Sequence, residues 1–190
     1  MIHLACLLLA MLAPPFWEAK APQTWTADEL NLLLSDSPWA EVLNPDPAIR
    51  VYLASARPMQ DAEAEILRRY KDQNPSEEPD LDYSDFLRDD HGEHLVLAVT
   101  YPHTNALADA EETRRMEEEC LMRIGKRKYK ITGYFPPTPS DPHLRLIFPR
   151  VVRPEDKTLI FELYLPGVAH PYRDAQFEIK ELIYKGKPEM

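Results

Sequence analysis

The sequence predicts an α+β protein with a sandwich-like, mainly antiparallel β-sheet, an N-terminal helix and two further helices packed on one side. Three observations support this fold class. Helical apolar spacing occurs only in the first two-thirds of the 190-residue chain, whereas beyond Cys120 the chain breaks into short alternating segments separated by prolines. The length suits one domain with a substantial core. We therefore expect a single α+β domain over residues 22–190, helix-rich in 22–119 and β-rich in 120–190.

The chain begins with a segment typical of a leader. Residues 1–13, MIHLACLLLAMLA, are apolar but shorter than the roughly 20 residues that span a bilayer. Ala19-Lys20-Ala21 supplies a small-x-small cleavage pattern. We expect residues 1–21 to be a signal peptide, and the mature protein to be exported to the periplasm or outside the cell, without a transmembrane span. The Leu4-Ala5-Cys6 triplet leaves processing by a lipoprotein peptidase as an alternative.

The first helix of the domain is specified by its N-terminus. Thr26 and Glu29 form a capping box, and Trp25 is placed to pack on Leu30. Pro38 restricts the residue before it, so the helix should end near residue 36. Two interpretations of the apolar side chains remain open: they complete the core, or they dock a partner through Trp25, Leu30, Leu34 and Trp39.

The other elements follow from hydrophobic periodicity. Residues 49–53 alternate as a strand, residues 62–70 and 105–119 have helical composition, and residues 74–90 form an acidic, proline-bearing connection. The unbroken apolar run at 95–99 predicts a strand buried on both faces. Further strands are expected at 121–124, 129–135, 144–148, 159–165 and 177–184, the last with a bulge where the alternation breaks.

Charge and glycine usage exclude several functional classes. The net charge is −10, which disfavours binding to nucleic acid and to anionic membranes. The chain has five glycines, and none lies in a dinucleotide-binding, P-loop or nucleophile-elbow pattern. We expect no catalytic residue of those classes and no cofactor.

Polar residues before the central strand form the best candidate metal site. His91 and His94 lie three positions apart in the stretch DDHGEH, beside several carboxylates. Zinc requires three or four convergent ligands, which this spacing does not supply by itself. The alternatives are a solvated turn, or a secreted hydrolase or metal-dependent enzyme that uses His91 and His94 with Asp82 or Asp85.

One dense basic stretch interrupts the acidic sequence. It lies on an expected hairpin and consists of Arg123, Lys126, Arg127, Lys128 and Lys130. It is a candidate site for an anionic ligand or envelope polymer. Alternatively, the lysines protect the edge of a sheet from pairing with other chains.

Several short motifs resemble a family of small exported bacterial proteins. These motifs are WTADEL from Trp25, SPWA from Ser37, FPR from Phe148, and KELIYKGK from Lys180. The family is loosely similar to proteins with a G-W-x-T-D domain, and no activity is known for it. The resemblance implies export and a bacterial envelope setting.

These observations favour an exported, non-enzymatic binding or structural module of the bacterial cell envelope. Its expected partner is an envelope protein or polymer. The secreted hydrolase or metal-dependent enzyme is the alternative.

Overall fold

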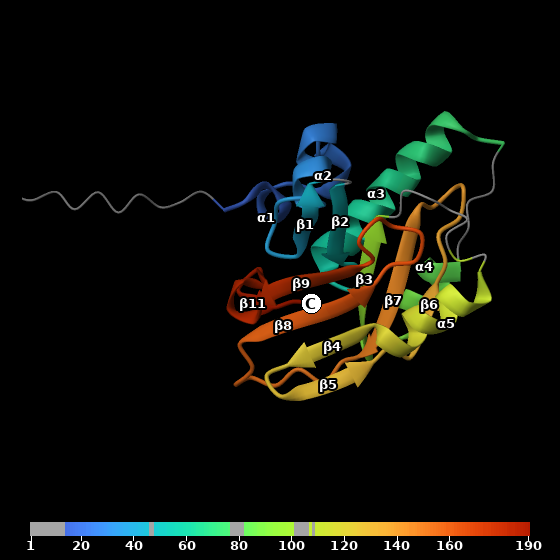
Figure 1. Ribbon diagram of the computed structural model, residues 1–190. Helices are drawn as coiled ribbons and strands as arrows, with labels where there is room; N and C mark the ends of the chain where they lie inside the picture. Colours follow the sequence, from blue (N-terminus) through green and yellow to red (C-terminus); the bar gives the residue numbers. More distant parts are fainter. Residues whose placement is uncertain (1–13, 46–47, 77–81, 101–106, 108) are drawn as a thin grey trace, which may run out of the picture.

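Two antiparallel sheets form the centre of the protein (Figure 1). The structure, a computed structural model, describes residues 14–45, 48–76, 82–100, 107 and 109–190. One sheet has the strand order β1 (Ala40–Pro45), β2 (Ala48–Leu53), β3 (His94–Thr100), β7 (His143–Pro149) and β6 (Gly133–Phe135). The other has the order β5 (Arg127–Lys130), β4 (Leu121–Ile124), β8 (Thr158–Tyr164) and β9 (Tyr172–Glu178). A short hairpin, β10 (Ile183–Tyr184) and β11 (Lys187–Pro188), follows. The predicted α+β, sandwich-like fold class is confirmed.

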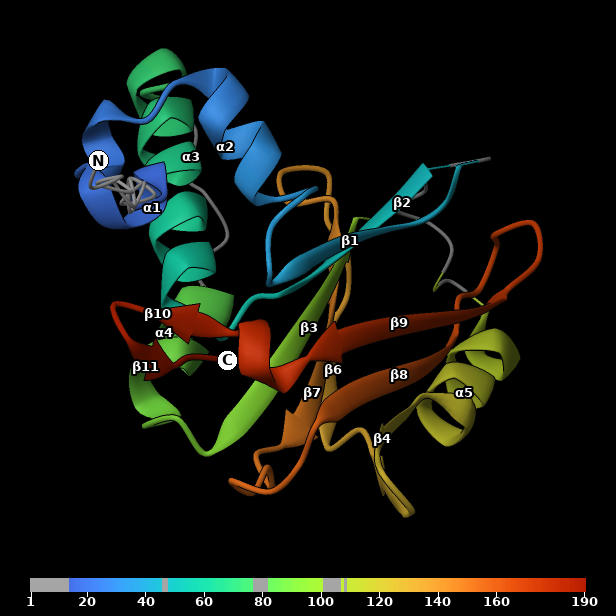
Figure 2. The same ribbon diagram turned by 90° about the vertical axis from the view of Figure 1, so that its left-hand side faces the viewer.

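The sheets pack face to face through large apolar side chains. Phe148 of β7 meets Phe161 of β8 with ring centroids 5.2 Å apart, and Phe161 meets Phe177 of β9 at 5.9 Å. The strands of the two sheets cross in this sandwich (Figure 2). Burial alternates along β9, as expected for a strand with one face toward the core and one toward solvent.

The helices cover both outer sides of the sandwich. Helix α3 (Arg57–Gln73) and α4 (Asp82–Asp89) lie over the outer face of the five-stranded sheet, and α2 (Ala27–Leu33) packs on α3 (Figure 2). Helix α5 (Ala110–Glu119) instead packs against β8 and β5 of the other sheet. Two of the predicted helices thus lie on one side, and the third lies on the opposite side.

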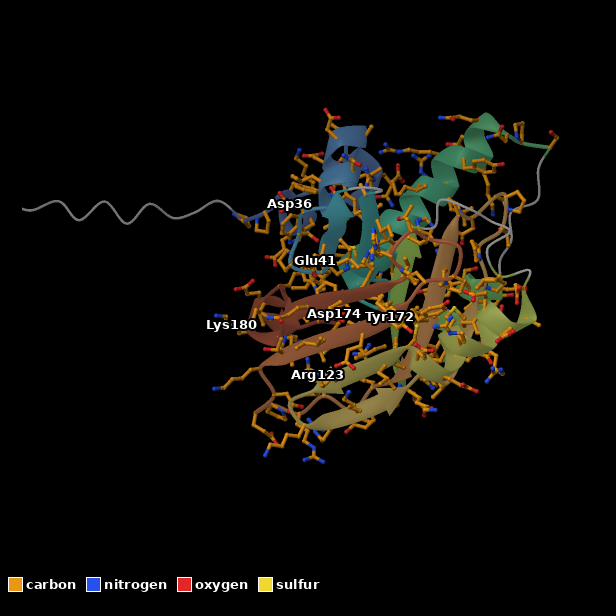
Figure 3. The ribbon with its side chains drawn as sticks, in the orientation of Figure 1. Asp36, Glu41, Arg123, Tyr172, Asp174 and Lys180 are labelled. Atoms are coloured by element: carbon orange, nitrogen blue, oxygen red, sulfur yellow. The ribbon has the colours of Figure 1, made fainter. Side chains whose placement is uncertain are left out.

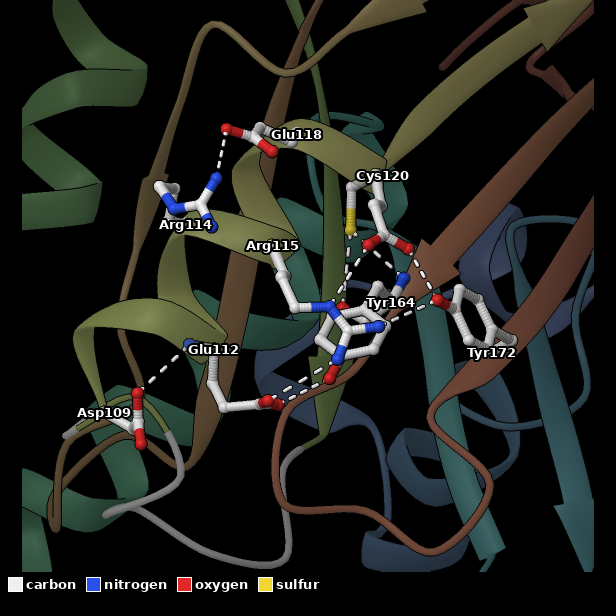
Figure 4. Close-up of polar contacts among 9 residues, drawn as sticks. Asp109, Glu112, Arg114, Arg115, Glu118, Cys120, Tyr164 and Tyr172 are labelled. Carbon is white, nitrogen blue, oxygen red and sulfur yellow. Dashed lines mark hydrogen bonds and ion pairs between the residues drawn. The ribbon is translucent and has the colours of Figure 1, made fainter.

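A polar cluster holds α5 against its sheet (Figure 4). The guanidinium of Arg115 lies over the ring of Tyr164, 4.3 Å from its centroid. The hydroxyl of Tyr172 donates to Glu119 at 2.7 Å and accepts from Arg115 at 3.0 Å. The adjacent Cys120 is buried, and burial raises the pKa of its thiol to about 11. This cysteine is therefore a core residue rather than a nucleophile at neutral pH.

Several boundaries differ from the sequence prediction. The connection expected at 74–90 contains α4, because Tyr83 and Phe86, three positions apart, both pack on Phe135 of β6. The strand expected at 129–135 is two strands, since the chain passes from the four-stranded to the five-stranded sheet between β5 and β6. The strand expected at 177–184 ends at Glu178, where a 3₁₀ turn stands in place of the predicted bulge. The irregular sequence of β1 gave no strand signal.

The first described residues pack on the domain. Helix α1 (Phe16–Ala19) places Phe16 5.7 Å from the ring of Trp25, and Trp17 6.1 Å from the ring of Trp39. The side chain of Glu18 accepts a hydrogen bond from the backbone of Lys185 at 2.8 Å. Phe16 and Trp17 of the expected signal peptide therefore pack against the core, whereas residues 1–13 lie outside the described chain. Cleavage after Ala21 stays a prediction. It would remove these contacts, so it should lower the free energy of unfolding by a measurable amount.

A chain that begins at Pro22 is expected to be less stable than one that begins at Pro14, by about 2 kcal/mol in the free energy of unfolding. The shorter chain lacks two half-buried aromatic side chains, Phe16 and Trp17, each worth about 1.5–3 kcal/mol when fully buried. Urea unfolding of both proteins measures the difference. A longer chain carrying Phe16→Ala and Trp17→Ala should show the same loss. Equal stability of all three would instead support cleavage after Ala21.

Across the described ranges, no helix is both long and apolar enough to cross a membrane.

Candidate functional site

A cavity of about 570 Å³ lies between α3, α4 and the outer face of the five-stranded sheet. Its volume is within the range of small-ligand sites, roughly 300–1,000 Å³. Residues from α2 to β7 contribute to it, and one part of its lining is aliphatic while the other is charged. The lining residues used below are Leu34, Tyr52, Arg57, Glu63, Ala64, Ile66, Leu67, Tyr70, Tyr83, Leu87, Arg88, Asp141, His143 and Arg145.

The sheet register sets the floor of the cavity. Tyr52 of β2 pairs with Ala98 of β3, and Ala98 pairs with Arg145 of β7, so the three side chains share one row and one face. Phe135 of β6 continues the row next to Arg145. Because Ala98 is small, it leaves space above β3 in which a side chain from α3 can reach both neighbours.

Glu63 of α3 occupies this position. Its Oε1 accepts from the hydroxyl of Tyr52 at 2.7 Å and from Nη2 of Arg145 at 2.9 Å. The other terminal nitrogen of Arg145 donates to Asp141, which also bonds Nδ1 of His143 at 2.6 Å. Only 6% of the Arg145 side chain is exposed. Five side chains from α3, β2, β7 and the turn before β7 thus form one polar network, in which Arg145 and Tyr52 are buried and the other three are partly exposed.

The charged state of the network follows from its contacts. Burial opposes ionisation of Asp141, but the bond to His143 and the charge of Arg145 hold the pKa of this carboxyl below its ordinary value. Burial likewise opposes the charge of Arg145, yet Glu63 and Asp141 raise its pKa. The floor therefore carries the guanidinium of Arg145 beside an ionised Asp141 at neutral pH, and Glu63 bonds to the same guanidinium.

Tyr83 of α4 completes the floor. The guanidinium of Arg145 lies over its ring, 4.1 Å from the centroid. Its hydroxyl is buried and makes no hydrogen bond of ordinary geometry within the described residues. Burial raises the pKa of both Tyr83 and Tyr52, so both hydroxyls stay protonated.

Another part of the lining, called the apolar wall below, is aliphatic. Ala64 and Leu67 follow the same stripe of α3 as Glu63, and Leu87 faces them from α4. Leu34 and Ile66 extend this wall, and Ile66 is 42% exposed at the opening. The cavity is therefore amphipathic: its lining combines aliphatic side chains with the preorganised polar floor.

The tryptophans and leucines considered for partner docking lie in the hydrophobic core or at the cavity. Trp25, Leu30 and Trp39 are buried at 2%, 5% and 0% exposure and belong to the hydrophobic core, so their side chains offer little surface to a partner. The indole of Trp39 donates to the backbone oxygen of Glu189 at 2.7 Å. Leu34 is half-buried and lines the cavity.

Within the described residues, the two histidines of the candidate metal site are not part of a group of three potential metal ligands. His91 is exposed in the turn after α4, and Nδ1 of His94 bonds to Asp90. Asp82 and Asp85 lie in the first turn of α4, where Asp85 pairs with Arg88 at 2.9 Å. Within the described ranges, no three His, Cys, Asp or Glu side chains are grouped to hold a metal ion.

The basic hairpin is largely neutralised by carboxylates. Arg123, labelled in Figure 3, and Lys128 both contact Glu162, at 2.7 and 3.0 Å. Arg127 makes a bidentate pair with Asp156 at 2.5 and 2.6 Å. Lys126 and Lys130 are exposed on the hairpin. These contacts fit a charged sheet edge better than an anion site, because three of the five cations already have partners.

The sequence prediction missed the floor of the cavity. One signal was present: Arg145 interrupts the apolar run LRLIF at a position that the strand period places against a helix-covered face. A charged residue there requires a buried partner. The partners themselves come from distant segments and carry no local pattern.

No protein-family model, curated protein or solved structure matches this chain with significant similarity.

Proposed function

We propose that this protein is a non-enzymatic binding protein of the bacterial envelope, and that it holds a small amphipathic molecule in the cavity between α3, α4 and the five-stranded sheet. The observation that carries the proposal is the pairing of an aliphatic wall with a preorganised polar floor in one cavity.

The rigidity of the floor supports binding. Arg145 is fixed by two carboxylates and the Tyr83 ring, so its side chain needs no further ordering when a ligand enters. Preformed sites with a few convergent polar groups in an apolar lining are typical of small-molecule binding.

The envelope setting rests on the sequence. The apolar leader and the resemblance of the WTADEL, SPWA and FPR motifs to exported bacterial proteins support export. The net charge of −10 directs the proposal away from nucleic acid.

The neutral fluorescent probe N-phenyl-1-naphthylamine tests the cavity, because its emission rises in apolar surroundings. We expect saturable binding to the native protein, and at least tenfold weaker binding to Ala64→Trp, which places an indole on the exposed rim of the apolar wall. Ala110→Trp, at the exposed start of α5, is the matched control and should bind as the native protein does. Melting curves verify that both variants fold. Absence of saturable binding, or equal binding by Ala64→Trp, would refute the proposal.

A further inference from the structure

We propose, on the basis of the proposed function, that the bound molecule carries a cationic head group, so that its class is an amphipathic amine or quaternary ammonium compound. The polar floor has a charge imbalance and an aromatic lining that both favour a cation.

The imbalance comes from the composition of the network. Glu63 and Asp141 face a single guanidinium, that of Arg145, so one negative charge is uncompensated when His143 is neutral. The network lies at the end of a largely apolar cavity, where charges interact more strongly than in water. A ligand cation would neutralise the floor, whereas an anion would add a second negative charge to it.

The arginines at the opening do not reverse this balance. Arg57 pairs with Asp61 at 3.0 Å, and Arg88 pairs with Asp85 at 2.9 Å and with Asp89 at 3.4 Å. More than half of each arginine side chain is exposed, at 61% and 68%, so solvent also screens their charges. With their partners included, neither arginine contributes a net positive charge at the opening.

Aromatic rings provide the second observation. Tyr52, Tyr70 and Tyr83 all line the cavity. Aromatic faces attract cations within about 6 Å of the ring centroid, and aromatic lining with nearby carboxylates is the usual means of recognising quaternary ammonium groups. Arg145 already occupies one face of the Tyr83 ring, 4.1 Å from its centroid, and Tyr52 is only 1% exposed, so the charge imbalance supports the inference more strongly than these two rings do.

Three probes of equal chain length separate the effect of charge from that of apolar contact. Octyltrimethylammonium, 1-octanol and octanoate compete with the bound fluorescent probe at pH 8, well above the ordinary pKa of a histidine side chain, about 6.5. We expect the cation to bind at least tenfold more tightly than the alcohol, and octanoate to bind most weakly. Asp141→Asn removes the excess negative charge and should bring the ratio of cation affinity to octanol affinity close to one. Glu63→Gln is the second variant with the same expectation.

The matched control is Asp174→Asn, which removes a carboxylate from the exposed face of β9, on the four-stranded sheet (Figure 3). It should keep the full preference for the cation. Equal affinities for the three compounds, or tightest binding of octanoate, would overturn the inference while leaving the amphipathic site intact. Failure of all three compounds and of the naphthylamine probe would refute the proposed function itself.

Discussion

Replacing Arg145 by methionine is expected to lower the free energy of unfolding by about 3–5 kcal/mol, because the change leaves two carboxylates without their shared guanidinium. Methionine keeps most of the side-chain volume, so the loss reports on charge rather than on a void. Urea or guanidinium unfolding followed by circular dichroism measures it. Arg123→Met is the matched control: this half-exposed arginine pairs with Glu162 at the surface, and its loss should cost at most about 1 kcal/mol.

Two further measurements connect this loss to the carboxylates. Adding Glu63→Gln and Asp141→Asn to Arg145→Met should recover part of the stability, since no buried charge then remains uncompensated. The pKa of Asp141 is lowered in the folded protein, so its contribution is present above the ordinary aspartate pKa, about 3.9, and is lost as the pH falls toward the folded value. The difference between native protein and Arg145→Met should therefore narrow below about pH 4. A pH-independent difference with no recovery in the triple variant would show that Arg145 acts by packing alone.

Replacing Trp39 by alanine is expected to cost a similar amount, about 3–5 kcal/mol. The indole is fully buried, with edge contacts to Trp17 at 6.1 Å and Tyr184 at 6.5 Å. It also donates a hydrogen bond to the backbone oxygen of Glu189. Thermal and chemical unfolding of the variant measure the combined loss of contacts.

Two comparisons make this prediction specific. Trp39→Phe keeps an aromatic ring but loses the donor, so it should cost less than Trp39→Ala. Leu32→Ala, at a position that is 43% exposed on α2, should change stability by less than about 0.5 kcal/mol. If Trp39→Ala were as stable as Leu32→Ala, the indole would not be part of the core, and partner docking would again explain it.

The elements specified by local signals were predictable from the sequence. The capping box of Thr26 and Glu29 forms as expected, with both reciprocal hydrogen bonds. The apolar run at 95–99 becomes β3, which pairs with β2 on one side and β7 on the other. In both cases the residues that determine the element lie within a few positions of one another.

Elements that depend on distant partners were not predictable. Helix α4 has an acidic sequence, and its apolar contacts become evident only once Phe135 is placed opposite Tyr83 and Phe86. Likewise, the floor of the cavity requires the pairing of β2, β3 and β7 to bring Tyr52 and Arg145 together. Long-range register, rather than composition, determines this site.

Trp39 contacts residues near both ends of the described chain, and these contacts limit how early its surroundings can fold. Trp17 packs on its ring, and the backbone of Glu189 accepts its indole hydrogen. The side chain of Glu189 also accepts a hydrogen bond from the backbone N–H of Arg57, the first residue of α3, at 3.0 Å. The surroundings of Trp39 and the start of α3 therefore cannot be completed until residue 189 has been synthesised. Because contacts of such long sequence separation form slowly, we expect the emerging chain to stay incompletely folded during synthesis.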